Sequence, residues 1–520
     1  MDQILHVFRK DIRRHWREIV LSIAILTAIA WSEPSQWMPP RSPETALRML
    51  LHQWLTPMVA IGWLFLIVRV VHGESLVGDR QFWVTRPYRW KKLLTAKAMF
   101  IAVFINLPLL VVQMSLLWKG GFAPARYLRG LLWMQCLWLM LLILPMTTLS
   151  AVTSGLGQTV LVLLGVLLSL IGLAALSSAT PDIGLPLAQR IPEWFPPTIL
   201  LGACVVVILW QYGWRRTQHS RLLLAVAAGI VLVTMTVTPH RSFDAHAYPQ
   251  ISSGQQLPVQ LTFDPAKSTA VRGAQIEKNK VYVQVPLLVS GTERGSVVVI
   301  DGMIVEIETS DGLHWNSGWF RSSLLLLPAQ THADALLAVD KVFFDQVKSR
   351  SAKIHISFAL TAFQSQETRR VTLGGGEFTT PGNAWCSLYP EISGLQCRSP
   401  LVTPFLLVTT LSEESTCPLQ ENEKTATPGT IFSALNWNWG AARAQFGISP
   451  VETFSLQFSQ GWRTNEESRA RLCPGTPLVF GLQKESQRSR SELSIDGIRL
   501  IDYQPKNFWP GDTVIGVAVH

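Results

Sequence analysis

Long apolar runs fill the first 240 residues of this 520-residue chain, and none follows them. A bilayer has a hydrocarbon core about 30 Å thick, which takes roughly 20 helical residues to cross. Every backbone amide inside that core must be bonded within its own segment, so the runs predict transmembrane helices. We expect seven spans, over residues 19–31, 47–71, 98–118, 128–149, 158–176, 198–212 and 222–237. The first run and the last two are short for a crossing, and Pro57, Pro108 and Pro145 are expected to kink their spans.

The second half of the chain alternates apolar and polar residues over short stretches, as residues 353–360 do. Asp-Gly and similar turn pairs separate these stretches, which is typical of β-strands. Strands are expected over 259–263, 281–289, 296–308, 354–363, 370–373, 401–410, 454–458, 478–482 and 498–503, and one helix over 335–347. This pattern predicts an all-β or mainly-β region, folded as one or two β-sandwiches.

These patterns divide the chain into three parts. Residues 1–238 form a transmembrane domain with an interfacial helix at its start, 239–258 form a linker, and 259–520 form the β-rich domain. At about 260 residues the last part is long enough for two subdomains, with a break expected near 381–418.

The charge of the chain agrees with a membrane protein. Only 15% of residues are charged, against ~25% in a typical soluble protein. The net charge of +10 does not predict nucleic-acid binding, because the basic residues of the first half lie mostly in short loops. With the N-terminus in the cytoplasm, inner segments carry fourteen Lys and Arg and outer loops carry six, as the positive-inside rule requires. Seven spans in a cytoplasmic (plasma) membrane then place the C-terminal domain outside.

The cysteines support an outer location for the second half. Four of the six cysteines lie there: Cys386, Cys397, Cys417 and Cys473. An even number of cysteines is typical of disulfides in an oxidising compartment, although a reduced cytosolic domain is the alternative. Three pairings are open; the short separation favours Cys386–Cys397, which leaves Cys417–Cys473. The sequence contains no Cys-x-x-Cys pair, which is the spacing typical of zinc sites, so a zinc site is not expected.

Few polar residues interrupt the spans, and no Asp or Glu falls in the middle of one. Ion-coupled carriers usually place ionisable groups there, so a proton- or sodium-driven transporter is not expected. Gln113 and Gln135 are expected to form hydrogen bonds across helices rather than to bind a substrate.

Two segments on the expected cytoplasmic side are amphipathic. The first, over residues 1–18, has apolar residues at helical spacing and five cations, which predicts a helix along the lipid headgroups. Its cations are Arg9, Lys10, Arg13, Arg14 and Arg17. The second, over residues 79–89, has Asp79 as an N-cap, Phe82 and Trp83 as an apolar face, and Pro87 as a stop. Such a short helix can fit a groove on a partner, or it can rest on lipid.

These two segments resemble the permease subunits of type-2 ABC (ATP-binding-cassette) transporters. The matches are 8–14, Phe-Arg-Lys-Asp-Ile-Arg-Arg, and 79–87, Asp-Arg-Gln-Phe-Trp-Val-Thr-Arg-Pro, and they cover at most residues 1–240. In such permeases the loop between spans two and three holds a coupling helix that docks on a separate ATPase subunit. The resemblance therefore implies ATPase contacts for Asp79, Arg80, Phe82, Trp83, Arg86 and Pro87. It also implies a homo- or heterodimer of membrane subunits.

The chain departs from that family in two ways. The usual permease has six spans and ends in the cytoplasm, whereas seven spans and a large outer domain are expected here. No Gly-x-x-x-x-Gly-Lys-Ser/Thr occurs, so any ATP chemistry belongs to a partner. We expect neither enzyme activity nor a cofactor in the chain itself.

The outer half shows no catalytic motif. Neither Gly-x-Ser-x-Gly nor His-Glu-x-x-His occurs, and His314, His332 and His355 are isolated. The tryptophans of 436–439 are expected either to bind a sugar or peptide or to pack in a core. The first functional hypothesis is therefore an ABC exporter subunit, the second a non-transporting anchor or sensor that displays a binding domain, and the third a membrane-bound enzyme.

Overall fold

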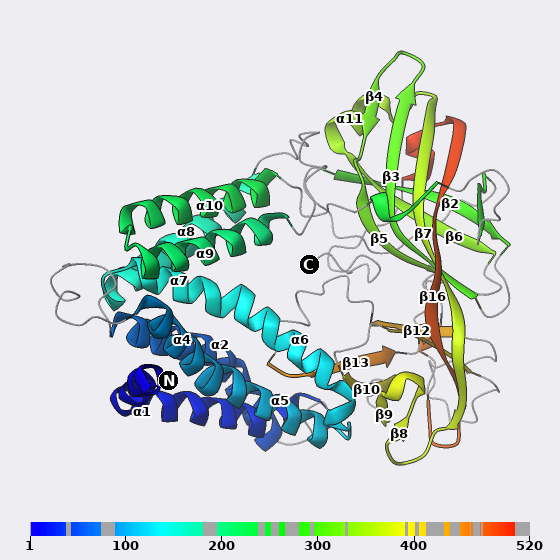
Figure 1. Ribbon diagram of the computed structural model, residues 1–520. Helices are drawn as coiled ribbons and strands as arrows, with labels where there is room; N and C mark the ends of the chain where they lie inside the picture. The colour runs from blue at the N-terminus through cyan, green and yellow to red at the C-terminus, as the bar shows by residue number, and fades with distance from the viewer. Residues whose placement is uncertain are drawn as a thin grey trace.

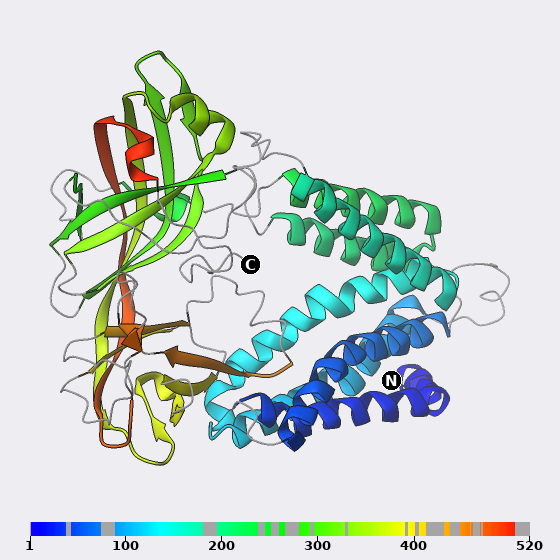
Figure 2. The same cartoon turned by 180° about the vertical axis from the view of Figure 1, so that it is seen from behind.

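Helices fill the first half and strands the second in the computed structural model of the chain (Figure 1). The structure describes residues 2–37, 43–73, 89–179, 195–237, 245–250, 259–265, 280–291, 296–327, 331–389, 394–400, 405–411, 431–436, 448–457, 459–460, 468–469 and 472–504. The β-rich region lies at one end of the helical bundle, and the N-terminus lies near the other (Figure 2). We name these the β end and the loop end, because Gly73 and Arg89, which flank the predicted coupling loop, lie at the latter.

The bundle is built mainly from long helices. In chain order they are α1 (Asp2–Ser32), η1 (Glu33–Gln36), α2 (Pro43–His72), α4 (Trp90–Ile101), η2 (Ala102–Asn106), α5 (Leu107–Lys119), η3 (Pro124–Tyr127), α6 (Leu128–Trp138), η4 (Leu139–Ile143), α7 (Leu144–Val152), α8 (Leu156–Ala179), α9 (Phe195–Gly213) and α10 (Thr217–Val237). Buried apolar side chains of α1, α2, α4, α6, α7 and α9 meet in one core, with Trp63 and Trp138 in edge-to-face contact at its centre.

Six helical segments of the described chain are long and apolar enough to cross a membrane. They are Gln3–Gln36, Pro43–His72, Trp90–Lys119, Pro124–Val152, Pro196–Gly213 and Thr217–Thr234. The expected span 158–176 lies within the 24-residue helix α8 (Leu156–Ala179), whose segment Leu156–Gly172 is apolar but is not among the six. The expected spans 198–212 and 222–237, which are short for a crossing in the sequence, both fall among the six.

Two of the three prolines inside spans follow a π-helical turn. The turn η2 precedes Pro108, and η4 precedes Pro145. Proline has no N–H to donate and its ring clashes with the carbonyl four residues earlier, so a wider turn before it relieves the conflict. Between these helices the Gln135 Nε2 donates to the Gln113 Oε1 at 2.8 Å, which confirms the expected bond across helices.

The second half contains antiparallel sheets. Its elements are β1 (Gln260–Phe263), β2 (Lys280–Ser290), β3 (Ser296–Thr309), β4 (His314–Asn316), β5 (Phe320–Leu326), β6 (His332–Asp340), α11 (Lys341–Val347), β7 (Ala352–Thr372), β8 (Phe378–Thr379), β9 (Trp385–Tyr389), β10 (Gly394–Pro400), β11 (Phe405–Leu411), β12 (Ile431–Asn436), β13 (Val451–Gln457), β14 (Ser459–Gln460), β15 (Ser468–Arg469) and β16 (Pro477–Ile498). Among the described residues the sheets are β1-β2-β6, β13-β10-β9-β8, β14-β15, and the order β12-β11-β16-β7-β3-β4 with β5 on β3.

Two hydrophobic cores organise these sheets. The first lies between the β1-β2-β6 sheet and the β3, β7 and β16 strands, and the second lies under β9, β10 and β11. The long strands β7 and β16 pair along both cores. Between the cores, residues 364–370 of β7 are exposed on both faces of the strand. Successive residues of a strand point to opposite faces, and this Gln-Ser-Gln-Glu-Thr-Arg-Arg stretch offers no apolar side chain to either face.

Two sequence-based predictions in this half are wrong. The helix expected over 335–347 begins only at Lys341, because the alternating stretch before it is strand β6, which pairs with β2. The strand expected over 498–503 is instead the end of β16 followed by the 3₁₀ turn η9 (Leu500–Tyr503). The break expected near 381–418 falls within the second core, which includes Cys386 and Leu407.

Candidate functional site

The predicted coupling loop begins and ends at the loop end of the bundle, after Gly73 and before Arg89. Its predicted contact residues Asp79, Arg80, Phe82, Trp83, Arg86 and Pro87 lie outside the described residues. The site can therefore be built from the two helix ends that hold the loop: the C-terminus of α2 and the N-terminus of α4.

Helix α1 turns sharply at this end. His15, with φ −115° and ψ 20°, leaves the helical region and separates an N-terminal part from the part that runs along the bundle (Figure 1). Val7, Asp11 and His15 of the N-terminal part are buried, at a spacing of four residues that puts them on one helix face. The predicted interfacial cations Arg9, Arg13, Arg14 and Arg17 are exposed, and Lys10 is half-buried.

A buried ion pair fixes this N-terminal part to both ends of the loop. Lys97 Nζ of α4 lies 2.7 Å from Asp11 Oδ2 of α1, and it donates to the Val70 carbonyl of α2 at 2.9 Å. Both charged side chains are at most 2% exposed. One ammonium group therefore joins the interfacial helix to the helix that enters the loop and to the helix that leaves it.

Further polar contacts extend this layer across the loop end. Arg69 of α2 pairs with Glu18 of α1 at 3.3 Å, and the His72 ring lies 3.2 Å from the Thr153 hydroxyl after α7. Arg221 of α10 donates from Nε to the Val152 carbonyl at 2.9 Å. These contacts link α2 to α1 and to the end of α7, and they link α10 to the end of α7.

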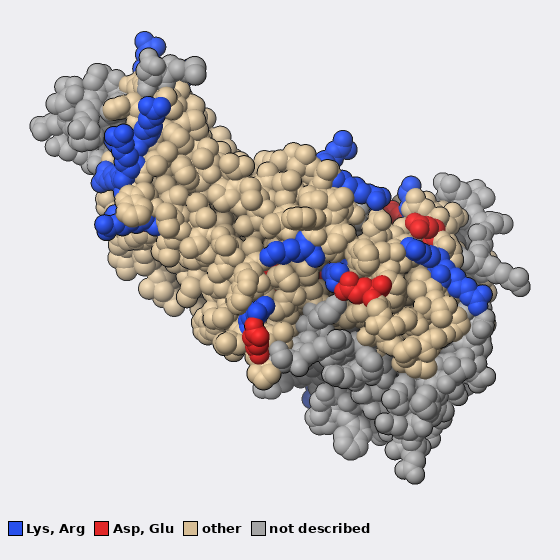
Figure 3. Space-filling view, turned by 90° about the horizontal axis from the view of Figure 1, so that it is seen from below, with Lys and Arg blue, Asp and Glu red and all other residues tan. Residues whose placement is uncertain are grey.

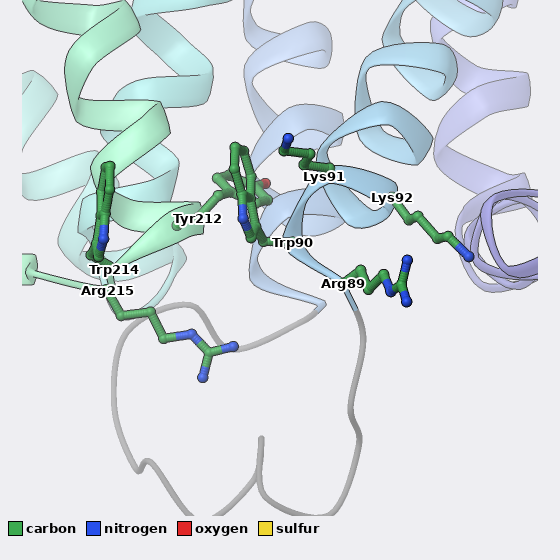
Figure 4. Close-up of a pocket in the computed structure, with 8 residues that line it drawn as sticks. Arg89, Trp90, Lys91, Lys92, Tyr212, Trp214 and Arg215 are labelled. Carbon is green, nitrogen blue, oxygen red and sulfur yellow. The ribbon is translucent and has the colours of Figure 1, made fainter.

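A basic and aromatic pocket opens beside the loop (Figure 4). It has a volume of about 690 Å³ and lies between the start of α4 and the end of α9. The described residues that line it are Arg89, Trp90, Lys91, Lys92, Tyr212, Gly213, Trp214 and Arg215. Four of the eight are cations and none is acidic, so the pocket favours an anionic group.

The opposite end of the bundle contacts the second core directly. The Gly120-Gly121 turn after α5 is in contact with β9, β10 and β13. Arg398 of β10 donates from Nε to the Gly120 carbonyl at 3.0 Å and forms two bonds to Glu377, at 2.6 and 2.7 Å. A Cβ at Gly121, whose φ is +85°, would lie 3.0 Å from the Trp385 Nε1. Only glycine fits this turn without strain.

A disulfide stabilises the strand pair that makes this contact. Cys386 of β9 and Cys397 of β10 are bonded, and the adjacent residues Trp385 and Arg398 face each other in the same register. The pairing favoured from the sequence is therefore present. Cys473 is disulfide-bonded as well, whereas Cys417 lies outside the described residues.

A second polar cluster lies where the segment after α10 meets the large sheet. The Tyr248 hydroxyl donates to Asp301 Oδ2 at 2.8 Å, and the Thr361 hydroxyl bonds the same oxygen. Asp301 sits at a β-bulge of β3, where the register shifts between Ile300 and Gly302. Burial raises the pKa of Asp301 to about 6, although the Thr361, Tyr248 and Arg488 contacts lower it.

The histidines singled out from the sequence do not come together. His332 lies 3.6 Å from Asp264, His355 contacts the Ser494 hydroxyl, and His314 is exposed in β4. Within the described part of the chain no group of three metal-binding side chains exists. Of the 436–439 stretch, only Asn436 at the end of β12 is described.

Sequence reasoning missed the Asp11–Lys97 pair. Lys97 is one of the fourteen Lys and Arg of the expected inner segments, and the sequence pattern assigns Asp11 no contact. The usable signal was the position of Asp11 on the face of Val7 and His15, two residues that are themselves buried. An acid on the inward face of a basic helix needs a buried cation as a partner.

Comparison with known proteins does not assign the chain to a family. No protein-family model matches it, and no curated protein resembles it significantly.

Proposed function

We propose that the chain is the permease-like membrane subunit of an ABC transporter, most consistent with an exporter, and that residues 79–89 contact a separate ATPase. The observation that carries the proposal is the contact of Lys97 with both Asp11 and the Val70 carbonyl. It joins the interfacial helix to both helices that hold the loop. A force applied to the loop by a partner would therefore move α1, α2 and α4 together rather than one helix alone.

The proposal places the chain in a plasma membrane with its N-terminus and loop end in the cytoplasm. Basic side chains support this orientation. On the face seen in Figure 3, Lys and Arg gather without neighbouring acids at the loop end, whereas farther along the molecule basic and acidic side chains lie side by side. Cations concentrate on the cytoplasmic side of membrane proteins.

Seven crossings then carry the β-rich region outside. The helix α8 (Leu156–Ala179), the fifth span in chain order, would cross in addition to the six long apolar helices and bring the number to seven. We infer that the outer region forms two β-sandwiches, one for each hydrophobic core. The bonded cysteines Cys386, Cys397 and Cys473 support an oxidising compartment, since disulfides are rare in the cytosol.

In the working complex, two membrane subunits would pair as a homo- or heterodimer, and the ATPase partner would hydrolyse ATP. The chain itself would supply neither the catalytic residues nor a cofactor. The outer region would receive the motion through the Gly120-Gly121 turn, which contacts Trp385 and Arg398.

Copurification tests the coupling. The tagged chain and a Phe82→Asp/Trp83→Asp variant are isolated from the native membrane, and copurified proteins are identified by mass spectrometry. A Trp31→Asp/Trp118→Asp variant is the matched control, because both tryptophans are exposed and lie toward the β end. We expect an ATPase with the wild type and the control, and its loss with the loop variant. Recovery of the same proteins with all three, without any ATPase, would remove the basis of the proposal.

The alternative is a non-transporting anchor or sensor that displays an outer binding domain. The direct contact of Arg398 with the Gly120 carbonyl favours it, because that contact fixes the outer region on the bundle. A chain that never copurifies with an ATPase, yet binds an envelope protein or ligand through residues 259–520, would support this alternative.

A further inference from the structure

We propose that the pocket between α4 and α9 binds the phosphate-bearing headgroup of an anionic phospholipid. This inference does not depend on the ABC assignment. Its basis is the lining of the pocket and its position at the end of two apolar helices (Figure 4).

The lining carries positive charge from two separate helix ends. Arg89, Lys91 and Lys92 come from the start of α4, and Arg215 follows α9, with no acid among the described lining residues. Figure 4 shows Arg215 reaching below the pocket from the end of α9, whereas Arg89 and Lys92 extend from the start of α4 on the side away from Arg215. Partial burial lowers the pKa of Arg215, and a bound anion would oppose that change.

The backbone holds Arg215 in a conformation that few side chains adopt. Its φ is +54°, in the left-handed region that favours glycine. Its N–H donates to the Trp210 carbonyl at 2.8 Å, and its carbonyl accepts the Thr217 N–H at 3.0 Å. A non-glycine residue is strained in this region, and such strain is concentrated at functional positions.

The surroundings favour a lipid over a soluble anion. Trp90 and Trp214 flank the pocket, and Trp214 is 68% exposed, as expected of a ring at headgroup level. Val205 and Leu209 are exposed on α9 and precede Gly213 at four-residue spacing, so an apolar track leads along the helix to the pocket. Acyl chains can follow that track while the phosphate lies among the cations. Basic pockets between helices bind anionic headgroups in this way.

Native mass spectrometry of the full chain in detergent tests the proposal. Phosphatidylglycerol, phosphatidylcholine with the same acyl chains, and inorganic phosphate alone are titrated separately. The Arg89→Gln/Arg215→Gln variant removes two pocket cations, and Arg126→Gln/Arg129→Gln removes two exposed arginines at the β end. Each cation near an anionic lipid contributes about a fivefold factor, so the pocket variant should bind phosphatidylglycerol about 25-fold more weakly. The control variant and the affinity for phosphatidylcholine should not change.

Three results would overturn the proposal. Equal affinity of the unaltered chain for the two lipids would exclude recognition of the anionic headgroup, and this comparison needs no variant. Equal losses in the pocket and control variants would show general attraction to the surface. Inorganic phosphate that binds as tightly as phosphatidylglycerol, and competes with it, would identify a site for a soluble anion.

Discussion

The two ends of the helical bundle are stabilised by different chemistry. At the loop end a buried ammonium–carboxylate pair, Lys97 and Asp11, joins three helices. At the β end a glycine turn fits against Trp385, and a disulfide holds the strands that make the contact. Packing and a covalent bond fix one geometry, whereas a charge layer beside a basic pocket can respond to a charged ligand or partner. The loop end is therefore where we expect regulation, and the β end is where we expect rigid contact.

We expect the largest loss of stability from a substitution that breaks the ion pair at the loop end. In Lys97→Met, Asp11 loses its cation while it stays buried, which should cost about 3–5 kcal/mol of unfolding free energy. Thermal unfolding of the full chain in detergent, followed by circular dichroism, measures the loss.

Two further variants sharpen this prediction. Asp11→Leu/Lys97→Met removes both charges and should recover most of the stability. Arg69→Met removes a pair whose arginine side chain is half exposed, so its effect should stay below about 1 kcal/mol. A double variant as unstable as Lys97→Met would show that shape, not charge, determines stability at the loop end.

The next effect tests whether the β region also depends on charge. Asp301 has a raised pKa of about 6 against 3.8 for an ordinary Asp, so the folded state binds the proton more tightly. Stability should therefore fall as the pH rises from about 4 to about 6, by roughly 3 kcal/mol at 1.36 kcal/mol per pKa unit. Asp301→Asn should abolish this dependence. Hydrogen exchange of the β3 amides, measured across this pH range, reports it; the same slope in the variant would assign the effect to another group.

We expect the smallest loss of stability from a substitution that disturbs the glycine turn at the β end. Gly121→Ala places a Cβ 3.0 Å from Trp385 Nε1 at a φ of +85°, and we expect a loss of about 2 kcal/mol. Gly312→Ala is the matched control, because Gly312 has a φ of +81° with nothing within 4 Å of its Cβ. The excess loss at Gly121 over Gly312, measured by hydrogen exchange of β9, is the contribution of the contact. Equal losses would mean that the contact with Trp385 contributes little.

Hydropathy predicted much of this architecture, because apolar length and strand alternation are local properties. The six long apolar helices and most of the long strands fall where the pattern predicted them. The pattern failed at 335–340, where the apolar run Ala-Leu-Leu-Ala-Val suits both a helix and a strand until pairing with β2 decides. It also missed the short strands β8, β9 and β10, which depend on their partners rather than on their own composition.

The sequence alone determined that an apolar helical half is followed by a β-rich half, since each depends on the spacing of side chains along a few neighbouring turns. Only the tertiary structure decided that Asp11 meets Lys97, 86 residues away, and that Arg398 meets the Gly120 carbonyl, 278 residues away. Charge pairs and close contacts of this kind depend on the three-dimensional arrangement of whole elements. No local pattern encodes that arrangement.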